Sequence, residues 1–502
     1  MTGGMCMVRP ASLVAIVAVL LAPGLVEGPS PDAAVFVLMG LRIRAGDMPY
    51  RDLWDHKPPG TYLLNALSQS AFPWLDPWLL CWLLSVVSTA LAVLLLFRLL
   101  HGRVSTGMAW FWSGVCAVAV ASYPTALGGG YTETFALLPL VAALSLVDSR
   151  RGSWPVAGTI GGLLGIACLI SVQSIPAAAA LAGAAALTTE GLRVSARRSV
   201  SLLTGGLVPP LLVLGWLVAG GALGAIVDQL LIYSVAYRAT SPGLLVVLAV
   251  VVLWLACLLL PSLVAIARLV RSPRSSGRID WVCLAWLVGY AAFVGYQNRM
   301  YLHYVILVLP PLALLAAPTF SGLWARIGSP RAGVRRLAFG LSAATIAMVL
   351  VGAVFAAEVT EVALGDASRW RVACSATAEW LSANTRASAR LFVWGDHPDL
   401  YLAAHRVPYG RYVYQYPMVT QGYWSAQKTE DLIKAWEADP PEIIVETPTD
   451  VPLFEVRTES GDGRDYDSLE PLREFVRGHY RLAATTGGLH VYLLVPGVAT
   501  GG

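Results

Sequence analysis

The chain is short of charge for its length. Only 13% of its 502 residues are charged and 56% are hydrophobic, whereas soluble globular domains carry about 25% charged residues. Apolar runs long enough to cross a bilayer as helices, roughly 17 to 25 residues each, recur between residues 11 and 357 and then stop. This composition excludes an ordinary soluble protein and predicts a polytopic α-helical membrane protein.

Lysine and the common cysteine patterns are also scarce. The only lysines are Lys57, Lys428 and Lys434. No stripe of basic residues is interleaved with aromatic residues, so a nucleic-acid surface is not expected. Most of the seven cysteines fall within apolar runs, and no CxxC or Cys/His metal spacing occurs. Neither a disulfide framework nor a thiolate zinc site is therefore expected.

About eleven apolar segments are expected to be transmembrane helices. The first is short and resembles the hydrophobic region of a signal peptide, so a retained span and a cleaved signal both stay open. The predicted spans are 11–26, 78–97, 106–123, 133–147, 155–171, 174–189, 200–219, 243–267, 280–297, 302–320 and 337–357.

Arginine is distributed unevenly over the connectors between these spans. Every second connector carries two to four arginines, whereas the intervening connectors 220–242 and 298–302 carry one each. Arginine-rich short connectors mark the cytoplasmic side. We therefore predict a cytoplasmic N-terminus and an extracytoplasmic location for the loop 27–77 and for the C-terminal residues. The preference for arginine over lysine suggests a GC-rich bacterial genome, so the expected location is the bacterial cell (inner) membrane.

The C-terminal part has the composition of a soluble domain. We expect residues 1–357 to form a transmembrane domain and residues 358–502 an extracytoplasmic α/β domain. Buried strands alternate with helices, which favours some parallel pairing. The predicted strands are 391–394, 442–445 and 489–494, and the predicted helices lie near 370–384, 397–404, 425–438 and 469–478.

The loop 27–77 is expected to hold two helices that lie along the membrane surface. Ser30-Pro31-Asp32 combines a capping residue, a proline in the first turn and an acid near the positive end of the helix dipole, so a helix is predicted over 31–45. A second apolar helix is predicted over 60–72, after Pro58-Pro59.

Ionisable groups are concentrated in the segment between these two helices. It contains Asp47, Arg51 and Asp52 and ends in Asp55-His56-Lys57. Because the rest of the membrane part avoids charge, we expect the chemistry of the protein at this face of the membrane.

Several motifs recur together along the chain. Asp32 just after the first span is followed by the stretch Gly46-Asp47-Met48-Pro49-Tyr50-Arg51-Asp52 and by Lys57-Pro58-Pro59. Further motifs are Gly130-Tyr131-Thr132-Glu133, Arg299-Met300-Tyr301-Leu302-His303-Tyr304, Phe392-Val393-Trp394-Gly395 and Arg411-Tyr412. Together they resemble the GT-C superfamily of glycosyltransferases, in particular the branch that contains the protein O-mannosyltransferases and the lipid A aminoarabinose transferases.

The resemblance implies an enzyme that takes a sugar from a polyprenyl-phosphate carrier. The sugar would pass to an extracytoplasmic acceptor, which is a cell-envelope glycan, a lipid or a protein. Residues 1–357 would then be the catalytic domain. One base beside one acceptor fits a single displacement, so we expect inversion at the anomeric carbon.

Asp32 and Glu133 are the expected catalytic acids. By resemblance, Asp32 matches the acid that faces donor and acceptor and would be the general base. Glu133 matches a second acidic position that is usually aspartate. On the residues alone a helix-capping role is equally open for Asp32, and Glu133 too is placed to stabilise a helix start.

The expected substrate-binding residues are polar groups at the same membrane face. Lys57 is a candidate for binding the carrier phosphate as a point charge, although a turn in which Lys57 pairs with Asp55 is the structural alternative. Arg299 is a second candidate cation, for which snorkelling to the interface is the alternative. The full set is Asp55, His56, Lys57, Tyr131, Arg299, His303 and Tyr304.

Two questions stay open at this point. No cofactor is demanded by the sequence, although a divalent metal held by Asp32, Asp55, His56 and Glu133 is not excluded by their chemistry. A transporter or flippase for lipid-linked glycans, or a polymerase or ligase, would use the same compartment. Transporters usually place ionisable residues near the bilayer midplane, whereas this chain places them at one face.

Overall fold

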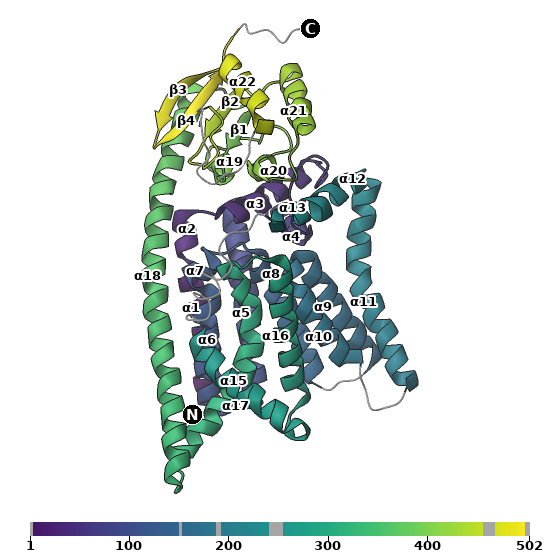
Figure 1. Ribbon diagram of the computed structural model, residues 1–502, viewed down its shortest axis with the longest axis vertical. Helices are drawn as coiled ribbons and strands as arrows, with labels where there is room; N and C mark the ends of the chain where they lie inside the picture. The colour runs from purple at the N-terminus through teal and green to yellow at the C-terminus, as the bar shows by residue number, and fades with distance from the viewer. Residues whose placement is uncertain (1–3, 150–152, 187–191, 240–254, 455–466, 497–502) are drawn as a thin grey trace.

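The computed structural model describes residues 4–149, 153–186, 192–239, 255–454 and 467–496. Long helices run side by side in one bundle, and a small sheet lies beyond one end of it (Figure 1). The long helices are α1 (Gly4–Leu21), α5 (Pro77–His101), α6 (Thr106–Ala121), α8 (Thr132–Asp148), α9 (Trp154–Ile170), α10 (Ile175–Ala186), α11 (Leu192–Ala219), α15 (Ala256–Arg271), α16 (Arg278–Gln297), α17 (Leu309–Arg326) and α18 (Ala332–Asn384).

The bundle confirms a polytopic helical membrane protein. Within the described ranges, six helical segments are long and apolar enough to cross a membrane. Several others, such as α6, α9 and α10, are apolar but shorter. Each predicted span overlaps one of the long helices, and the predicted span 243–267 lies partly outside the described residues, which resume at Leu255. The number of spans and their orientation stay predictions.

Two helices in the bundle contact each other through glycines. On α9, a Cβ built on Gly161 would lie 2.0 Å from the Leu202 carbonyl oxygen of α11, and one on Gly165 would lie 2.3 Å from the Gly206 carbonyl oxygen. Small residues at such positions let membrane helices approach backbone to backbone. The two helices are therefore held by close van der Waals contact rather than by long side chains.

The last membrane helix differs from its prediction. The sequence predicts a span over 337–357 and a separate helix near 370–384, but α18 continues from Ala332 to Asn384 without a break. The physical reason is that residues 358–369 contain no proline and only one glycine, so nothing ends the helix. The predicted boundary at residue 357 therefore falls within a continuous helix, and the division into two domains remains a proposal.

The two helices predicted in the first loop are present, while their position along the membrane surface stays a prediction. They are α3 (Pro31–Arg44), whose Ser30 side chain accepts a hydrogen bond from the Ala33 amide at 3.4 Å, and α4 (Gly60–Ala71). They pack closely, because a Cβ built on Gly40 of α3 would lie 2.7 Å from the Cβ of Asn65 of α4. Short helices complete this end of the bundle: α2 (Pro23–Glu27), α7 (Tyr123–Ala126), α12 (Leu223–Ile226) and α13 (Tyr233–Ala239).

The C-terminal residues form a four-stranded sheet in the order β1-β2-β4-β3. Strands β1 (Leu391–Trp394) and β2 (Ile443–Glu446) pair in parallel, as expected, whereas β4 (Leu489–Leu494) pairs antiparallel with β2 and β3. Strand β3 (Tyr480–Thr486) is not predicted by the sequence. It is an edge strand with several exposed residues and no continuous apolar run. The helices between the strands are α19 (Asp399–Ala403), α20 (Tyr416–Val419), α21 (Ala426–Ala438) and α22 (Glu470–His479).

The sheet region lies directly over the first loop (Figure 1). The Trp54 amide donates to the Arg411 carbonyl at 2.8 Å, and the Arg411 guanidinium donates to the Tyr50 carbonyl at 2.9 Å. Arg103, from an arginine-rich connector, instead pairs with Asp280 at 3.0 Å and with Asp148 at 3.7 Å. The ends of α5, α8 and α16 near these residues lie at the end of the bundle away from the sheet (Figure 1). The first loop and the C-terminal residues thus share one side of the bundle, as the arginine pattern predicts.

Candidate active site

Asp32 and Lys57 form an ion pair at the start of α3. The Lys57 Nζ lies 2.5 Å from Asp32 Oδ1 and 4.9 Å from the centroid of the Phe36 ring. The Asp32 side chain remains 37% exposed and that of Lys57 23% exposed. The expected alternative, a pair between Lys57 and Asp55, is not seen. The pair therefore packs against protein, including the Phe36 ring, and is also partly accessible to solvent.

Burial disfavours the charged form of both groups, but the attraction between the two opposite charges outweighs this effect. For Asp32, the positive charge and hydrogen bond of Lys57 outweigh desolvation, so the pKa of this carboxyl lies below its usual value. For Lys57, desolvation is outweighed by the charges of Asp32 and Asp55, so its pKa lies above its usual value. Both groups are therefore ionised at neutral pH.

Asp55 is enclosed by protein donors. It has no exposed surface. One carboxylate oxygen accepts from the Tyr62 hydroxyl at 2.5 Å, and the other accepts from the Tyr414 hydroxyl and from the His56 amide, each at 2.8 Å. Burial opposes ionisation here as well, but these bonds and the charges of His56 and Lys57 hold the pKa of Asp55 below its usual value. Its contacts describe a structural anchor, and its predicted substrate-binding role stays untested.

His56 lies between Asp55 and a group of aromatic rings. Its Nδ1 is 3.3 Å from an Asp55 oxygen. Its ring centroid is 5.0 Å from that of Tyr233 and 5.1 Å from that of Tyr237, both on α13. This placement brings α13 into contact with the first loop.

Glu133 lies in the first turn of α8, buried among hydroxyls. Ser171 and Thr132 each donate a hydrogen bond to it at 2.9 Å, and His303 Nε2 lies 3.9 Å from the same carboxylate. The His303 ring stacks on Tyr131 with ring centroids 4.1 Å apart and planes 9° apart. The motif around residue 131 and the motif around residue 303, far apart in the sequence, are thus brought together.

A glycine turn lets the starts of α3 and α8 approach each other. Gly130 has φ +92°, and a Cβ built there would lie 2.6 Å from the Cβ of Ala33. Only glycine combines this backbone conformation with this closeness. Glu133 consequently lies near enough for its charge to act on Lys57, and Asp32 and His303 lie near enough to interact electrostatically. The predicted residues Asp32, Lys57, Glu133 and His303 therefore form one electrostatic group.

Arg299 and Tyr304 flank this group. The Arg299 guanidinium lies 3.3 Å from the centroid of the Tyr237 ring, and it donates to the Tyr237 carbonyl and, at 3.0 Å, to the Tyr301 hydroxyl. The Tyr304 ring is edge-on to His303, with centroids 4.9 Å apart. Arg299 thus links α13 to the segment before α17, and its predicted contact with phosphate remains a prediction.

The metal expectation finds no support in the geometry. Among the residues that the structure describes, no three His, Cys, Asp or Glu side chains form a group suited to a metal ion. Asp32 is paired with Lys57, and both oxygens of Asp55 accept from protein donors. The four residues considered as a ligand set are therefore not arranged as one, and no step below involves a metal.

Some residues of the site were missed by the sequence analysis. Tyr62, Gln229 and Tyr414 surround the first-loop acid Asp55, and Ser171 holds Glu133. One available signal was the alternation of tyrosines at 412, 414 and 416. Such a period-two pattern presents one set of hydroxyls to one side of an extended chain.

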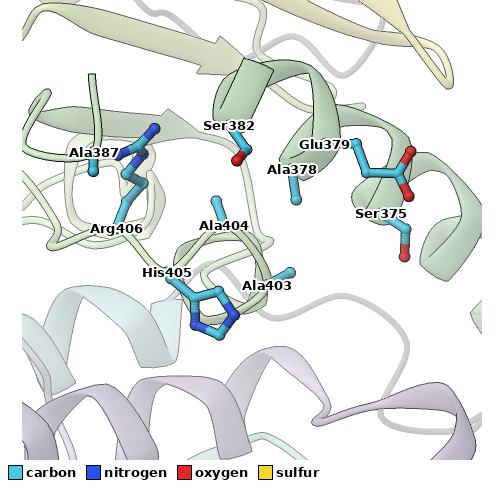
Figure 2. A pocket seen from close by; sticks show the side chains of 9 residues that line it. All are labelled: Ser375, Ala378, Glu379, Ser382, Ala387, Ala403, Ala404, His405 and Arg406. Carbon is cyan, nitrogen blue, oxygen red and sulfur yellow. The ribbon is translucent and has the colours of Figure 1, made fainter. Parts of the chain in front are cut away.

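A separate cavity of about 450 Å³ lies between the end of α18 and the loop that follows α19 (Figure 2). None of the predicted site residues lines it. Its lining residues are Ser375, Ala378, Glu379, Ser382, Ala387, Ala403, Ala404, His405 and Arg406.

Comparison with known proteins shows the fold. No protein-family model and no curated protein matches the sequence. The structure is similar to that of ArnT, an aminoarabinose transferase, from Cupriavidus metallidurans bound to undecaprenyl phosphate, with a TM-score of 0.61 and 15% identity over 99% of each chain. The apo form of the same protein has a TM-score of 0.59 at 15% identity, covering 97% of this chain and 99% of that one.

A further match is the archaeal oligosaccharyltransferase AglB from Archaeoglobus fulgidus, in complex with an inhibitory peptide and a dolichol-phosphate. It has a TM-score of 0.47 and 13% identity, covering 97% of this chain and 74% of that one. The two ArnT structures therefore show that this chain shares the ArnT fold, which is the fold that the resemblance seen in the sequence implies.

Proposed function

We propose that the protein is a membrane glycosyltransferase that uses a polyprenyl-phosphate sugar as its donor. The observation that carries the proposal is the half-open Asp32–Lys57 pair, with Glu133 and His303 beside it. A fold shared with ArnT over nearly the whole chain supports it, because that protein was crystallised with undecaprenyl phosphate. The acceptor would be an extracytoplasmic glycan, lipid or protein.

The proposed reaction is a single displacement. The Asp32 carboxylate takes the proton of an acceptor hydroxyl, and the hydroxyl oxygen attacks the anomeric carbon. The bond from that carbon to the phosphate oxygen breaks, and polyprenyl phosphate leaves with its electron pair. Lys57 stabilises the negative charge that develops on the phosphate. The product has the inverted anomeric configuration.

The ion pair gives a physical reason for activation by the donor. Lys57 lowers the pKa of Asp32, so in the free protein Asp32 is a weak base. A donor phosphate that pairs with Lys57 would compete with Asp32 for the ammonium group and partly neutralise it. The pKa of Asp32 would then rise, and the carboxylate would become a better base only when the donor is bound.

The decisive test measures release of polyprenyl phosphate by purified protein supplied with undecaprenyl-phosphate sugars. Loss of a general base typically costs about 10²- to 10⁴-fold in rate, so Asp32→Asn should lose at least about 100-fold. The matched control is Asp52→Asn in the same loop, whose carboxylate pairs with exposed Arg51 and which should change the rate by about twofold or less. Turnover of Asp32→Asn equal to that of wild type would refute the role of Asp32.

A second measurement separates this proposal from a transporter. In sealed vesicles a flippase would move the lipid-linked sugar across the bilayer without breaking the bond between sugar and phosphate, whereas the proposed enzyme releases the carrier. NMR of the product decides the stereochemistry, and retention would contradict the single displacement.

We further propose that the first loop and residues 358–502 face the extracytoplasmic side of the bacterial inner membrane. The arginine-rich connectors at the opposite end support this orientation. A cysteine in place of Arg386, whose side chain is 77% exposed in the C-terminal part, should react with a membrane-impermeant maleimide in spheroplasts. A cysteine at Arg271, at the end of α15, should react only after lysis, and the reverse pattern would invert the topology.

A further inference from the structure

The turn after strand β1 leads into α19, which packs against α3, the helix that begins beside the Asp32–Lys57 pair. Its Asp396 comes from the C-terminal part of the chain, yet the charges of Asp32 and Lys57 both act on its carboxyl group. Tyr416 donates a hydrogen bond to Asp396 at 2.5 Å and is itself affected by the charge of Asp32. Two side chains that the sequence does not single out thus lie near enough to the proposed base to interact with its charge.

The position of this turn is fixed by several contacts. Gly395 has φ +132°, and a Cβ built on it would lie 1.8 Å from Thr447 Oγ1, so only glycine fits. The Gly395 carbonyl accepts a hydrogen bond from the Gln415 amide at 3.0 Å. The residue on one side of Gln415, Tyr414, binds the first-loop anchor Asp55, and the residue on the other side, Tyr416, binds Asp396.

These three consecutive residues connect the first loop, the turn and the carboxylate of Asp396. The position of the turn relative to the first loop, which carries Lys57, is therefore fixed by these hydrogen bonds.

The negative charge of the Asp396 carboxylate is not balanced by an ion pair within the described part of the chain. Its hydrogen bond comes from a neutral tyrosine. The neighbouring acid Asp399, by contrast, accepts from the Trp370 indole at 2.5 Å and lies 3.5 Å from His397. Burial, together with the nearby negative charge of Asp32, raises the pKa of Asp396 to about 6. A partly buried carboxylate in this position gains from a ligand that supplies hydrogen-bond donors.

We propose that Asp396, oriented by Tyr416, binds the acceptor substrate above Asp32, and that the acceptor presents a neutral, hydroxyl-rich group of the carbohydrate type. This inference rests on the proposed function, since it assigns the acceptor side of the same site. The carboxylate accepts hydrogen bonds from acceptor hydroxyls. The Tyr416 side chain, 38% exposed, offers an aromatic face of the kind against which the C–H groups of a sugar ring pack. Anionic acceptors are disfavoured, because Asp32 and Asp396 repel them.

The test uses the full chain, an undecaprenyl-phosphate sugar as donor, and two probe acceptors that differ by one charge, methyl glucoside and methyl glucuronide. Wild type should transfer sugar to the glucoside with the higher kcat/KM. Asp396→Asn should raise the KM for the glucoside about 10-fold or more, as expected for loss of a charged hydrogen bond, with kcat within about twofold. The same variant should also reduce the ratio of kcat/KM for the glucoside to kcat/KM for the glucuronide.

Tyr416→Phe is the second variant, because it keeps the ring and removes only the hydroxyl that orients Asp396. Its KM for the glucoside should rise about 2- to 12-fold, less than for Asp396→Asn, because the carboxylate keeps its charge and loses only the bond that orients it. Asp431→Asn, an exposed acid on α21, is the control and should leave both constants unchanged.

The outcomes separate the two proposals. If wild type releases no polyprenyl phosphate from any donor, the proposed function fails and this inference fails with it. If wild type releases the carrier but Asp396→Asn leaves the KM for the glucoside unchanged, only the inference is overturned. Release of the carrier with transfer to the glucuronide in preference to the glucoside would also overturn it, as would a fall in kcat without a change in KM.

Discussion

Replacing Tyr414 by phenylalanine should loosen the contact between the first loop and the C-terminal part of the chain. The Tyr414 hydroxyl donates to the Asp55 carboxylate at 2.8 Å, and both side chains are buried. Hydrogen bonds to charged groups contribute about 1.5–3 kcal/mol. The same Asp55 oxygen keeps its bond from the His56 amide, which favours the lower half of that range.

Amide hydrogen exchange measures this loss directly, because local opening sets the exchange rate. The Trp54 amide, bonded to the Arg411 carbonyl, and the Gln415 amide, bonded to the Gly395 carbonyl, report on the contact. A loss of about 1.5–2.2 kcal/mol, the lower half of the range, should speed their exchange roughly 10- to 40-fold, since each 1.4 kcal/mol corresponds to about a factor of ten. Mass spectrometry of peptides covering residues 49–57 and 408–416 in detergent gives the readout.

Tyr412→Phe is the matched control two residues away. The Tyr412 hydroxyl makes no hydrogen bond to a residue within the described ranges, so its removal should change exchange by no more than about twofold. In a double-mutant cycle with Asp55→Asn, the effect of Tyr414→Phe should largely disappear, because the two side chains act on one bond. Unchanged exchange in Tyr414→Phe, or equal changes in both single tyrosine variants, would refute the anchoring role of Asp55.

Three further predictions follow from the structure. Gly161→Ala should lower the free energy of unfolding in detergent by about 1–3 kcal/mol, because a Cβ there would lie 2.0 Å from a carbonyl oxygen of α11. The control Gly215→Ala should not lower it, because no heavy atom of the described chain lies within 4 Å of the new Cβ. Glu133→Gln should reduce the rate of carrier release about tenfold or more without unfolding, since it removes the charge that acts on Lys57 and His303; an unchanged rate would remove Glu133 from the site. The KM for the methyl glucoside should rise as the pH falls through about 6, because Asp396 binds the acceptor as a carboxylate and protonation removes that form. The groups whose charges or hydrogen bonds act on Asp396 are Tyr416, His397, Asp32 and Lys57. If the KM of Asp396→Asn depends on pH in the same way as that of wild type, Asp396 is not the titrating group.

Features that depend on neighbouring residues were predictable from the sequence. The start of α3 follows from Ser30-Pro31-Asp32, and the observed cap from Ser30 to the Ala33 amide is the contact that the pattern implies. The buried strands β1 and β4 follow from short apolar runs, and both lie where they were predicted. Capping and burial patterns act over a few residues, so a single sequence contains them.

Features that depend on distant contacts were not predictable in the same way. Asp55 is bound by Tyr414, which lies 359 residues away, and its amide donates to Gln229, which lies 174 residues away. The local sequence of a polar loop does not determine which distant segment will pack against it. The pairing of Lys57 with Asp32 instead of with nearby Asp55 is also a tertiary result, since it depends on where α3 begins relative to the loop that follows it.

The three acids Asp32, Asp55 and Glu133 have the same kind of side chain, but their positions in the structure suit them to different roles. A general base needs an oxygen that a substrate can reach, and the acids differ in this respect. Asp55 is wholly buried with both oxygens engaged by protein donors, and Glu133 accepts from two hydroxyls in the bundle. Asp32 remains 37% exposed and is held, within the described residues, through one oxygen only, by a lysine that a phosphate can attract. Of the three, Asp32 alone combines access with a partner that a donor phosphate would attract, so this difference in enclosure supports the proposal that Asp32 is the base, beside the resemblance.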